Sequence, residues 1–310
     1  MRSRLLKIVG YLAVAAVLLV GPFMLARHML AVSRTDAFLA DQPNYLAHLP
    51  PPKKVKMTKR LERLLRKDMH TVHAVPRIFL SRLPEGLPDM TNAQNKKRMF
   101  TSAMLPLVLR ANELIMADRG RLLSVREKLE NEQKLRRTER EWLKTMARKY
   151  RLKRRNNFRT QDIDILLHKV DVIPPSLALA QAAMESGWGT SRFAQLGNAL
   201  FGEWVWGDGE GILPEARDEG KTHKIKKFEY LLDSVSSYMT NLNRHDSYAG
   251  LRRRRAELRD LNLPVTGAAL APALVSYSER GTDYVSDILS IINYNDLDGL
   301  DSARLAALTS

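Results

Sequence analysis

The sequence predicts a mainly helical protein with a small β-hairpin lobe, preceded by a helical region and an N-terminal membrane helix. Three observations support this fold class. Apolar residues recur at spacings near three and four over long stretches, as they do on the buried face of a helix. A glycine-rich and then alternating segment follows Phe201, with Ile225 and Phe228 at strand-like positions. A charge-free, mostly apolar run covers residues 8–26.

The apolar run near the N-terminus predicts a single membrane-spanning helix. Arg2, Arg4 and Lys7 precede it, and Arg27 closes it. About 20 residues cross the hydrocarbon core of a bilayer, so the run is long enough. The positive charges before it place the N-terminus in the cytoplasm and the rest of the chain on the outer, periplasmic side of the inner membrane. The run exceeds a signal-peptide core, so we expect an uncleaved anchor, with cleavage near residues 30–33 as the alternative.

Three parts of the chain are predicted: an anchor over residues 1–30, a basic and mostly helical region over 31–160, and a C-terminal domain over 161–310. In the second part we expect two or more amphipathic helices that pack on the C-terminal domain as scaffold, rather than a dedicated partner-binding arm. The chain has no cysteine, so its stability comes from packed apolar surface. The apolar positions of these helices are Phe100, Met104, Leu107, Leu114, Ile115, Leu122, Leu123, Val125 and Leu129.

Two amphipathic helices are also predicted in the C-terminal part. Asp233 and Ser234 are residues that cap helix N-termini, so the first of these helices should begin there. Their apolar stripes are core faces: Val235, Tyr238, Met239 and Leu242 in the first, and Val285, Ile288, Leu289 and Ile292 in the second.

The run from Met184 to Ser191 places one carboxylate and one indole at the end of a short apolar helix. Prolines stand at the entrance of this helix, and Gly187 supplies its stop. The negative end of the helix dipole and the apolar surroundings both raise the pKa of Glu185. A carboxylic acid that stays protonated can protonate a glycosidic oxygen, and Trp188 can stack on a sugar ring. The alternative is a solvated glutamate beside an ordinary core tryptophan.

The chain resembles the bacterial glucosaminidase family of peptidoglycan hydrolases, which includes flagellar rod-cap and autolysin domains. Residues 182–191 carry every fixed position of the family pattern A-x-x-E-S-x-W-G-x-S, and residues 198–202 match N-x-L-F-G. The tail over residues 277–284 looks like a variant of Y-A-x-D-P-x-Y. Residues 241–245 and 96–100 are similar to signatures of the membrane-anchored Bax-type branch of the family.

This resemblance implies a lysozyme-like domain that hydrolyses the glycan strand of peptidoglycan next to N-acetylglucosamine, with Glu185 as the catalytic acid. We expect the substrate to contact Trp188, Phe201, Trp204 and Tyr277. Trp204 and Trp206 have the spacing of two residues on one face of a strand, where core packing is an equal alternative. Asn198 is expected to bond backbone at a turn.

The resemblance also implies a second catalytic carboxylate in the β-lobe, because the family often carries its second acidic residue on a strand ahead of the Phe228 position. Glu215 and Glu219 both qualify by that alignment, and we favour Glu219 as base or electrostatic partner. In the alternative, the 2-acetamido group of the sugar acts as internal nucleophile. Tyr284, and secondarily Tyr277, would then orient that group. The acidic residues of the segment are Glu203, Asp208, Glu210, Glu215, Asp218 and Glu219.

The formal net charge of +16 indicates affinity for polyanions. An exported location argues against nucleic acid and favours acidic lipid or the anionic groups of a cell wall. The histidines are scattered, so we expect neither a metal nor another cofactor. Two other functions stay open: a non-catalytic wall-binding scaffold, and a lytic transglycosylase. The basic clusters lie at Lys53–Lys54, at Arg148, Lys149, Arg151, Lys153, Arg154 and Arg155, and at Arg252–Arg255.

Overall fold

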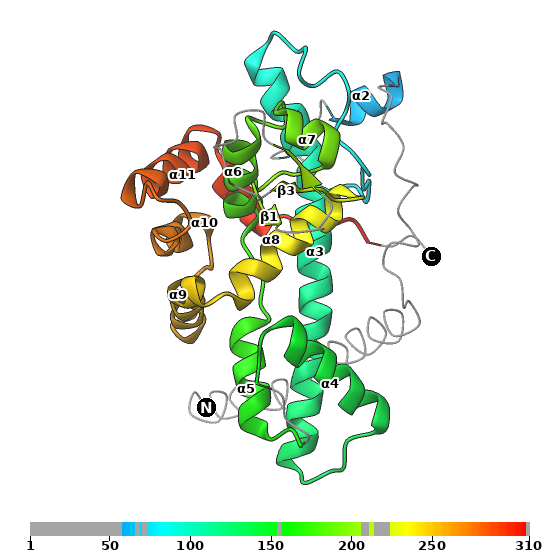
Figure 1. Cartoon of the computed structure of the whole chain (residues 1–310), viewed down its shortest axis with the longest axis vertical. Coiled ribbons are helices and arrows are strands. Elements are labelled where there is room, and N and C mark those ends of the chain that lie inside the picture. The colour runs from blue at the N-terminus through cyan, green and yellow to red at the C-terminus, as the bar shows by residue number, and fades with distance from the viewer. Residues whose placement is uncertain are drawn as a thin grey trace, which may run out of the picture. The chain divides into compact units, whose positions relative to one another are not determined.

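The computed structural model describes residues 58–65, 69, 74–153, 157–205, 211–213 and 224–307. These residues belong to one unit that spans 48–310. They are mainly helical and include a small antiparallel sheet, which confirms the predicted combination of helices and a β-lobe (Figure 1). The predicted membrane helix over residues 8–26 lies outside the described residues. None of the helices in the described part of the chain has both the length and the apolar character that a bilayer crossing requires.

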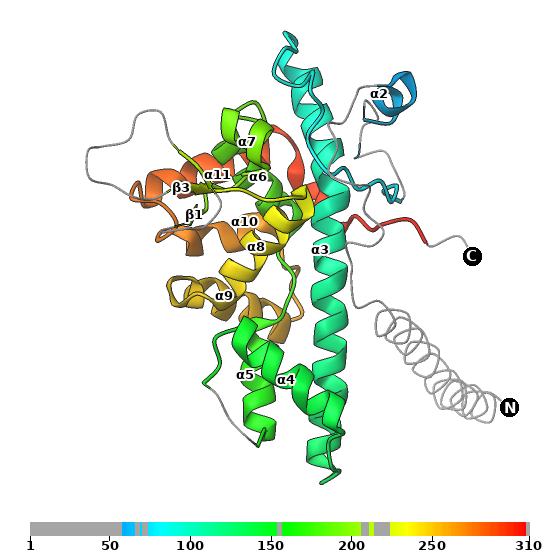
Figure 2. The same cartoon turned by 45° about the vertical axis from the view of Figure 1, so that its right-hand side comes forward.

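The long helix α3 is the main scaffold element of the described residues. In Figures 1 and 2 it runs as one continuous rod beside the other helices. It packs against α5, α6 and α8. The described elements in chain order are α2 (Lys59–Leu65), α3 (Ala93–Glu130), α4 (Arg137–Lys149), α5 (Thr160–Lys169), α6 (Pro175–Ser186), α7 (Arg192–Gly197), β1 (Trp204–Val205), β2 (Gly211–Ile212), β3 (Lys224–Lys226), α8 (Leu231–Arg244), η3 (Asp246–Tyr248), α9 (Ala249–Asp260), α10 (Gly267–Leu270), η4 (Ala271–Leu274), α11 (Thr282–Tyr294) and η5 (Leu297–Ser302).

The helices expected between residues 91 and 152 are α3 and α4. Asn92 caps α3, because its side-chain oxygen accepts a hydrogen bond from the backbone N–H of Asn95 at 2.9 Å. Phe100, the central apolar residue of this stretch, is fully buried. Leu123 was expected on the apolar face but is 49% exposed, because it falls on the side of α3 away from the neighbouring helices. Since α3 packs on α6 and α8, this helix acts as scaffold for the C-terminal domain.

Helix α6 is buried on almost every side, as its lack of a polar face predicts. It begins with Pro175 at its first turn, where a missing N–H has no intrahelical partner. It ends at Gly187, which adopts the left-handed conformation with φ 57°. The predicted start and stop of this helix are therefore confirmed. Helices α3, α10 and α11 and the 3₁₀ turn η5 pack around it.

The sheet has the strand order β1-β3-β2, with both pairs antiparallel. Ile225 pairs with Trp204 on one side and with Ile212 on the other. Phe228 was expected in a strand, but β3 ends at Lys226. Its side chain is buried, and its N–H donates to the carbonyl of Gly197 at 2.8 Å. Phe228 thus ties the sheet to α7 instead of extending β3.

Asn198 has the structural role expected of it. It is fully buried in the left-handed region with φ 53°, and its Nδ2 donates to the carbonyls of Ser81, Phe228 and Glu229 at 3.0–3.2 Å. An asparagine can adopt this backbone conformation and supply the side-chain donors for the turn.

Helix α8 begins earlier than predicted, at Leu231 rather than after Ser234. The carboxylate of Asp233 is in the first turn and accepts the N–H of Tyr230 at 3.2 Å. Asp233 therefore satisfies a backbone donor from inside the helix instead of acting as its N-cap. The predicted apolar stripe, including Val235 and Leu242, is buried.

A buried ion-pair cluster holds the segment that leads into α6. The carboxylate of Asp171 accepts two hydrogen bonds of 2.6 Å from Arg259, and the Nε of Arg255 lies 3.7 Å from it. Arg255 is 1% exposed and donates to the carbonyls of Asp171 and Val172. Burial raises the pKa of Asp171, but the bond from Arg259 and the charges of Arg255 and Arg119 outweigh it, so the pKa is lowered. The cluster therefore stabilises the fold at neutral pH, and this contribution to the free energy of unfolding is lost as the pH falls through the pKa of Asp171.

This cluster corrects the expectation that the whole basic run Arg252–Arg255 is available to polyanions. Arg252 and Arg255 are both buried, and Arg252 donates to the carbonyls of Leu242 and His245. Half of the run therefore serves the fold, because its helical spacing turns two of the four side chains inward.

We predict that Arg255→Met lowers the free energy of unfolding by about 3 kcal/mol, because it leaves buried carbonyls and part of the Asp171 charge without their donor. The matched control is Arg254→Met on the exposed face of α9, for which we expect a change within about 0.5 kcal/mol. Chemical unfolding of the whole chain measures both values. Equal losses for the two variants would contradict the structural role of Arg255.

Candidate active site

Glu185 lies in the last turn of α6, where the helix leaves the core. Its side chain is partly buried between the end of α6 and α11. Burial raises the pKa of Glu185, and a hydrogen bond from Tyr284 opposes part of this rise. The net direction is upward, as the sequence predicted. The negative end of the helix dipole acts in the same sense as burial.

A chain of directed hydrogen bonds ends on this carboxyl group. The hydroxyl of Tyr238 donates to Oε1 of Gln181 at 2.6 Å, and Nε2 of Gln181 donates to the hydroxyl of Tyr284 at 2.8 Å. The hydroxyl of Tyr284 in turn donates to Oε1 of Glu185 at 3.0 Å. Gln181 is fully buried and the two tyrosines are 2% exposed. Every member of the chain has a partner, so the network orients the acid rigidly.

The two oxygens of Glu185 have different surroundings. Oε1 accepts the Tyr284 hydroxyl proton, which leaves Oε2 as the oxygen that can carry the acidic proton. Gly202 lies beside Oε2, because a Cβ built on this glycine would be 3.6 Å from that oxygen. Gly202 has φ 63°, a conformation that favours glycine. The N-x-L-F-G segment thus places a glycine, which has no side chain, next to Oε2 of Glu185.

Aromatic rings surround the carboxyl group and its partners. The ring of Phe201 stacks on Tyr238 with 3.9 Å between centroids, and Tyr277 stacks on Tyr284 at 5.3 Å. The ring centroid of Tyr248 lies 6.0 Å from that of Tyr277. Burial raises the pKa of Tyr284, and the neighbouring Glu185 carboxylate raises it further, so the hydroxyl stays protonated and remains a donor. These rings supply the apolar surroundings that disfavour an ionised Glu185.

The structure brings three of the residues predicted for the site, Tyr284, Tyr277 and Phe201, close to Glu185. Tyr284 bonds to it directly. Phe201 is buried, and its carbonyl accepts the hydroxyl of Tyr277 at 3.4 Å. Trp204 stands at the start of β1, two residues after Gly202, and is 49% exposed. Contact of these side chains with a substrate stays a prediction.

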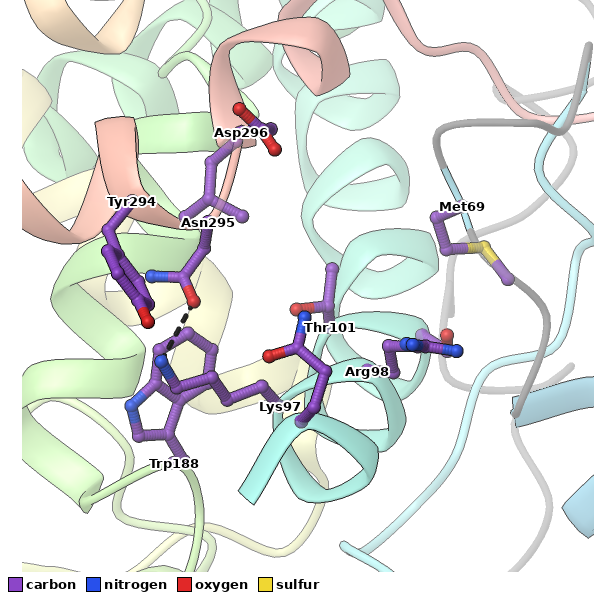
Figure 3. A pocket seen from close by; sticks show the side chains of 11 residues that line it. Met69, Lys97, Arg98, Thr101, Trp188, Tyr294, Asn295 and Asp296 are labelled. Carbon is purple, nitrogen blue, oxygen red and sulfur yellow. Dashed lines mark hydrogen bonds between the residues drawn. The ribbon is translucent and has the colours of Figure 1, made fainter. Parts of the chain in front are cut away.

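Three predicted residues of the β-lobe, Glu215, Glu219 and Trp206, lie outside the described residues. Trp188 is described but faces a different part of the surface. Its indole packs edge-on against Phe100 with 5.7 Å between centroids, and it lines a separate pocket with residues of α3 and of the end of α11 (Figure 3). Glu185 is not among the residues that line this pocket.

Three further residues belong to the surroundings of Glu185 without having been predicted there: Gln181, Tyr238, which was expected only on a core face, and Glu203, which was named only among the acidic residues of the lobe. Oε2 of Glu203 accepts a hydrogen bond from the hydroxyl of Ser237 at 2.7 Å and lies 3.6 Å from the ammonium of Lys226. Its other oxygen, Oε1, is buried and has no hydrogen-bond donor among the described residues. Burial raises the pKa of Tyr248, and the charges of Glu185 and Glu203 raise it further, so both carboxylates act on one tyrosine. A polar glutamine inside an otherwise apolar helix was the available signal for Gln181.

A metal site is absent from the part of the chain that the structure describes. No group of three or more histidine, aspartate or glutamate side chains there could hold a metal ion.

Comparisons with known proteins identify the family of the chain. A family model described as mannosyl-glycoprotein endo-beta-N-acetylglucosaminidase matches residues 161–297, which include Glu185, Phe201 and Tyr284. Protein bax of Escherichia coli (strain K12) is 33% identical over 226 residues, which cover 73% of this chain and 76% of that protein. No solved structure matches. The chain therefore belongs to the glucosaminidase family, in the branch that contains Bax.

Proposed function

We propose that this protein is an endo-β-N-acetylglucosaminidase that hydrolyses the glycan strand of peptidoglycan, with Glu185 as general acid. The observation that carries the proposal is a partly buried carboxyl group whose pKa is raised by burial and whose Oε1 is held by Tyr284. Such a group is protonated at higher pH than an ordinary glutamate and is fixed in one orientation. Membership of the glucosaminidase family supports the glycan substrate.

In the proposed reaction, Oε2 of Glu185 gives its proton to the glycosidic oxygen as the bond to the sugar carbon breaks. The leaving sugar departs as an alcohol, and the remaining sugar becomes an oxocarbenium-like centre that water attacks. The water loses a proton to a base, and the new hydroxyl group completes the hydrolysis. Tyr284 acts on the acid as a positioning residue, because it holds Oε1 and thereby directs Oε2 at the bond.

The second carboxylate in this proposal is Glu219, acting as base or electrostatic partner; the family resemblance allows Glu215 or Glu219, and we favour Glu219. The geometry offers Glu203 as a competitor, because its buried Oε1 lacks a donor among the described residues and its charge reaches the same tyrosine as Glu185. In a substrate-assisted reaction the 2-acetamido group of the sugar acts as internal nucleophile, and neither Glu219 nor Glu203 is needed as second carboxylate.

The proposed place of action is the outer face of the inner membrane. The apolar run over residues 8–26 would anchor the chain, and its flanking positive charges would keep the N-terminus in the cytoplasm. Peptidoglycan is then within reach of the C-terminal domain.

We predict that Glu185→Gln lowers kcat on purified peptidoglycan by about 10²- to 10⁴-fold, because glutamine cannot donate the proton. Mass spectrometry of wild-type products should find new N-acetylglucosamine reducing ends. Anhydro-muramic ends would instead identify a lytic transglycosylase, and tight wall binding without fragments would identify a scaffold.

The control for this variant is Glu229→Gln on an exposed glutamate, which should keep full activity. Stability provides a second check. Because the native pKa of Glu185 is raised, the wild type loses stability relative to Glu185→Gln as the pH rises through that pKa. Unfolding measured at acidic and neutral pH should show this difference growing with pH.

For Tyr284→Phe we predict an upward shift in the alkaline limb of the pH–kcat profile. The hydroxyl of Tyr284 lowers the pKa of Glu185, so its removal lets the acid stay protonated to higher pH. The maximal kcat falls because Oε1 is no longer held. Tyr277→Phe is the matched control, since its hydroxyl bonds to the Phe201 carbonyl and should leave the limb in place. An unchanged limb in Tyr284→Phe would refute the assigned coupling.

The pair Glu219→Gln and Glu203→Gln separates the candidates for the second carboxylate. We expect Glu219→Gln to lower kcat by about 10²-fold or more and Glu203→Gln by less than about tenfold. The reverse order would transfer the role to Glu203. Near-wild-type rates in both variants, together with inhibition by a thiazoline analogue of the acetamido intermediate, would establish the substrate-assisted reaction. Steady-state kinetics on peptidoglycan measure all three outcomes.

A further inference from the structure

A pocket lies at the junction of α3, Trp188 and the end of α11, with a volume of about 150 Å³. Figure 3 shows the side chain of Lys97 reaching from α3 toward Trp188 and Asn295, with Tyr294 beside them. The proposed reaction assigns no task to Lys97, Tyr294 or Asn295. Arg98 and Asp296 also line the pocket.

Lys97 carries a charge that no carboxylate of the described residues neutralises. Its ammonium lies 5.0 Å from the ring centroid of Trp188 and 4.9 Å from that of Tyr294, and it donates to Oδ1 of Asn295 at 3.0 Å. All of these partners are neutral. Some lysines in the described part of the chain do have an acidic partner, for example Lys144, which pairs with Glu141. A cation held by aromatic faces and one amide keeps its full attraction for an anion.

The pocket as a whole favours an anionic ligand. Lys97 and Arg98 contribute two positive charges to its lining, and Asp296 contributes one negative charge. Neither Arg98 nor Asp296 forms an ion pair within the described residues, so the lining keeps a net positive charge.

The aromatic residues of the pocket, Trp188 and Tyr294, are placed where a ligand could contact their rings. Trp188 adopts a left-handed backbone conformation with φ 57°, which is unusual for a bulky side chain. Its indole is fixed from behind by the edge-on contact with Phe100. Tyr294 is 80% exposed, although one face of its ring lies near Lys97. Exposed aromatic faces are suited to stacking on a sugar ring or an amide plane.

The pocket is also connected to the acid through the chain. Trp188 follows Glu185 by three residues, so the two Cα atoms are at most about 11 Å apart. Helix α11 supplies Tyr284 to the acid and, at its other end, Tyr294 to the pocket. At 1.5 Å per residue these two tyrosines are about 15 Å apart along the helix axis. A bound glycan with a branch can reach from one to the other.

We propose that this pocket binds the carboxylate carried by a muramoyl unit of the substrate, either on its lactyl group or on its stem peptide, through Lys97. The inference rests on the proposed function, because it deepens the substrate class of that site. Trp188 and Tyr294 contact the sugar or amide planes beside the carboxylate, and Asn295 keeps the ammonium in place.

Isothermal titration of the whole chain with three probes tests this inference without turnover. N-acetylmuramic acid carries a free lactyl carboxylate. In muramyl dipeptide the lactyl carboxylate is closed as an amide, and the free carboxylate is on the peptide. N-acetylglucosamine carries no carboxylate and serves as the neutral probe. We expect at least one acidic probe to bind more tightly than the neutral probe, and the one that does so identifies the source of the carboxylate.

The variant Lys97→Met should weaken binding of that acidic probe at least tenfold and leave the neutral probe unchanged. Lys96→Met is the matched control, because Lys96 is the adjacent lysine of α3, bonds to the Pro88 carbonyl and does not line the pocket. Both variants remove one charge, so a general electrostatic effect would appear equally in both. On peptidoglycan, Lys97→Met should raise KM with kcat unchanged.

Equal affinity of wild type and Lys97→Met for both acidic probes would overturn the inference, and so would equal weakening by Lys96→Met. Circular dichroism shows whether the variants fold. Lys97-dependent binding by a protein that releases no glycan fragments would retain the pocket and reject the proposed hydrolysis. Hydrolysis without Lys97-dependent binding would do the opposite, so the two failures are distinguishable.

Discussion

The hydrogen-bond chain from Tyr238 through Gln181 and Tyr284 to Glu185 connects the core of the protein to its candidate acid. Gln181 is fully buried in α6, so both ends of its amide need partners. Helix α8 supplies one partner and α11 supplies the other, which fixes these two helices against α6. Because the Tyr284 hydroxyl accepts a hydrogen bond from Gln181, its own proton is free to be donated to Glu185. The orientation of the acid is thus a consequence of satisfying a polar group in the core.

The same arrangement sets the protonation of the acid through two opposing effects. Burial disfavours the charged carboxylate and raises the pKa of Glu185, while the bond from Tyr284 stabilises that charge and lowers the pKa. Because burial is the larger effect, the pKa of Glu185 is raised. The bond from Tyr284 falls on Oε1, so in the proposed reaction Oε2 carries the proton. A hydrogen-bond network of this kind can set the pKa of a carboxyl group without a second charged residue in contact with it.

Helix α3 contributes to both the fold and the surface around the site. It packs against α6 and α8, and it provides Lys97 for the pocket beside Trp188. The buried cluster around Asp171 and Arg255 secures the start of α6, as Tyr284 and Gln181 secure its end. Helix α3, which precedes residue 160, is therefore part of the frame that positions Glu185.

The sequence by itself determined the helix of α6 and its stop at Gly187, and it pointed to Glu185 as the candidate acid, because helix propensity, left-handed glycine and a family motif are local properties. It did not predict that Arg255 is buried or that Gln181 and Tyr238 lead to the acid. These residues meet partners tens of residues away, and composition gives no sign of such pairings. Trp188 belongs to the same motif as Glu185, yet it lines a different pocket. Only the packing of α3, α8 and α11 around α6 decided which side chains share a site, since contacts between distant segments depend on how whole helices pack.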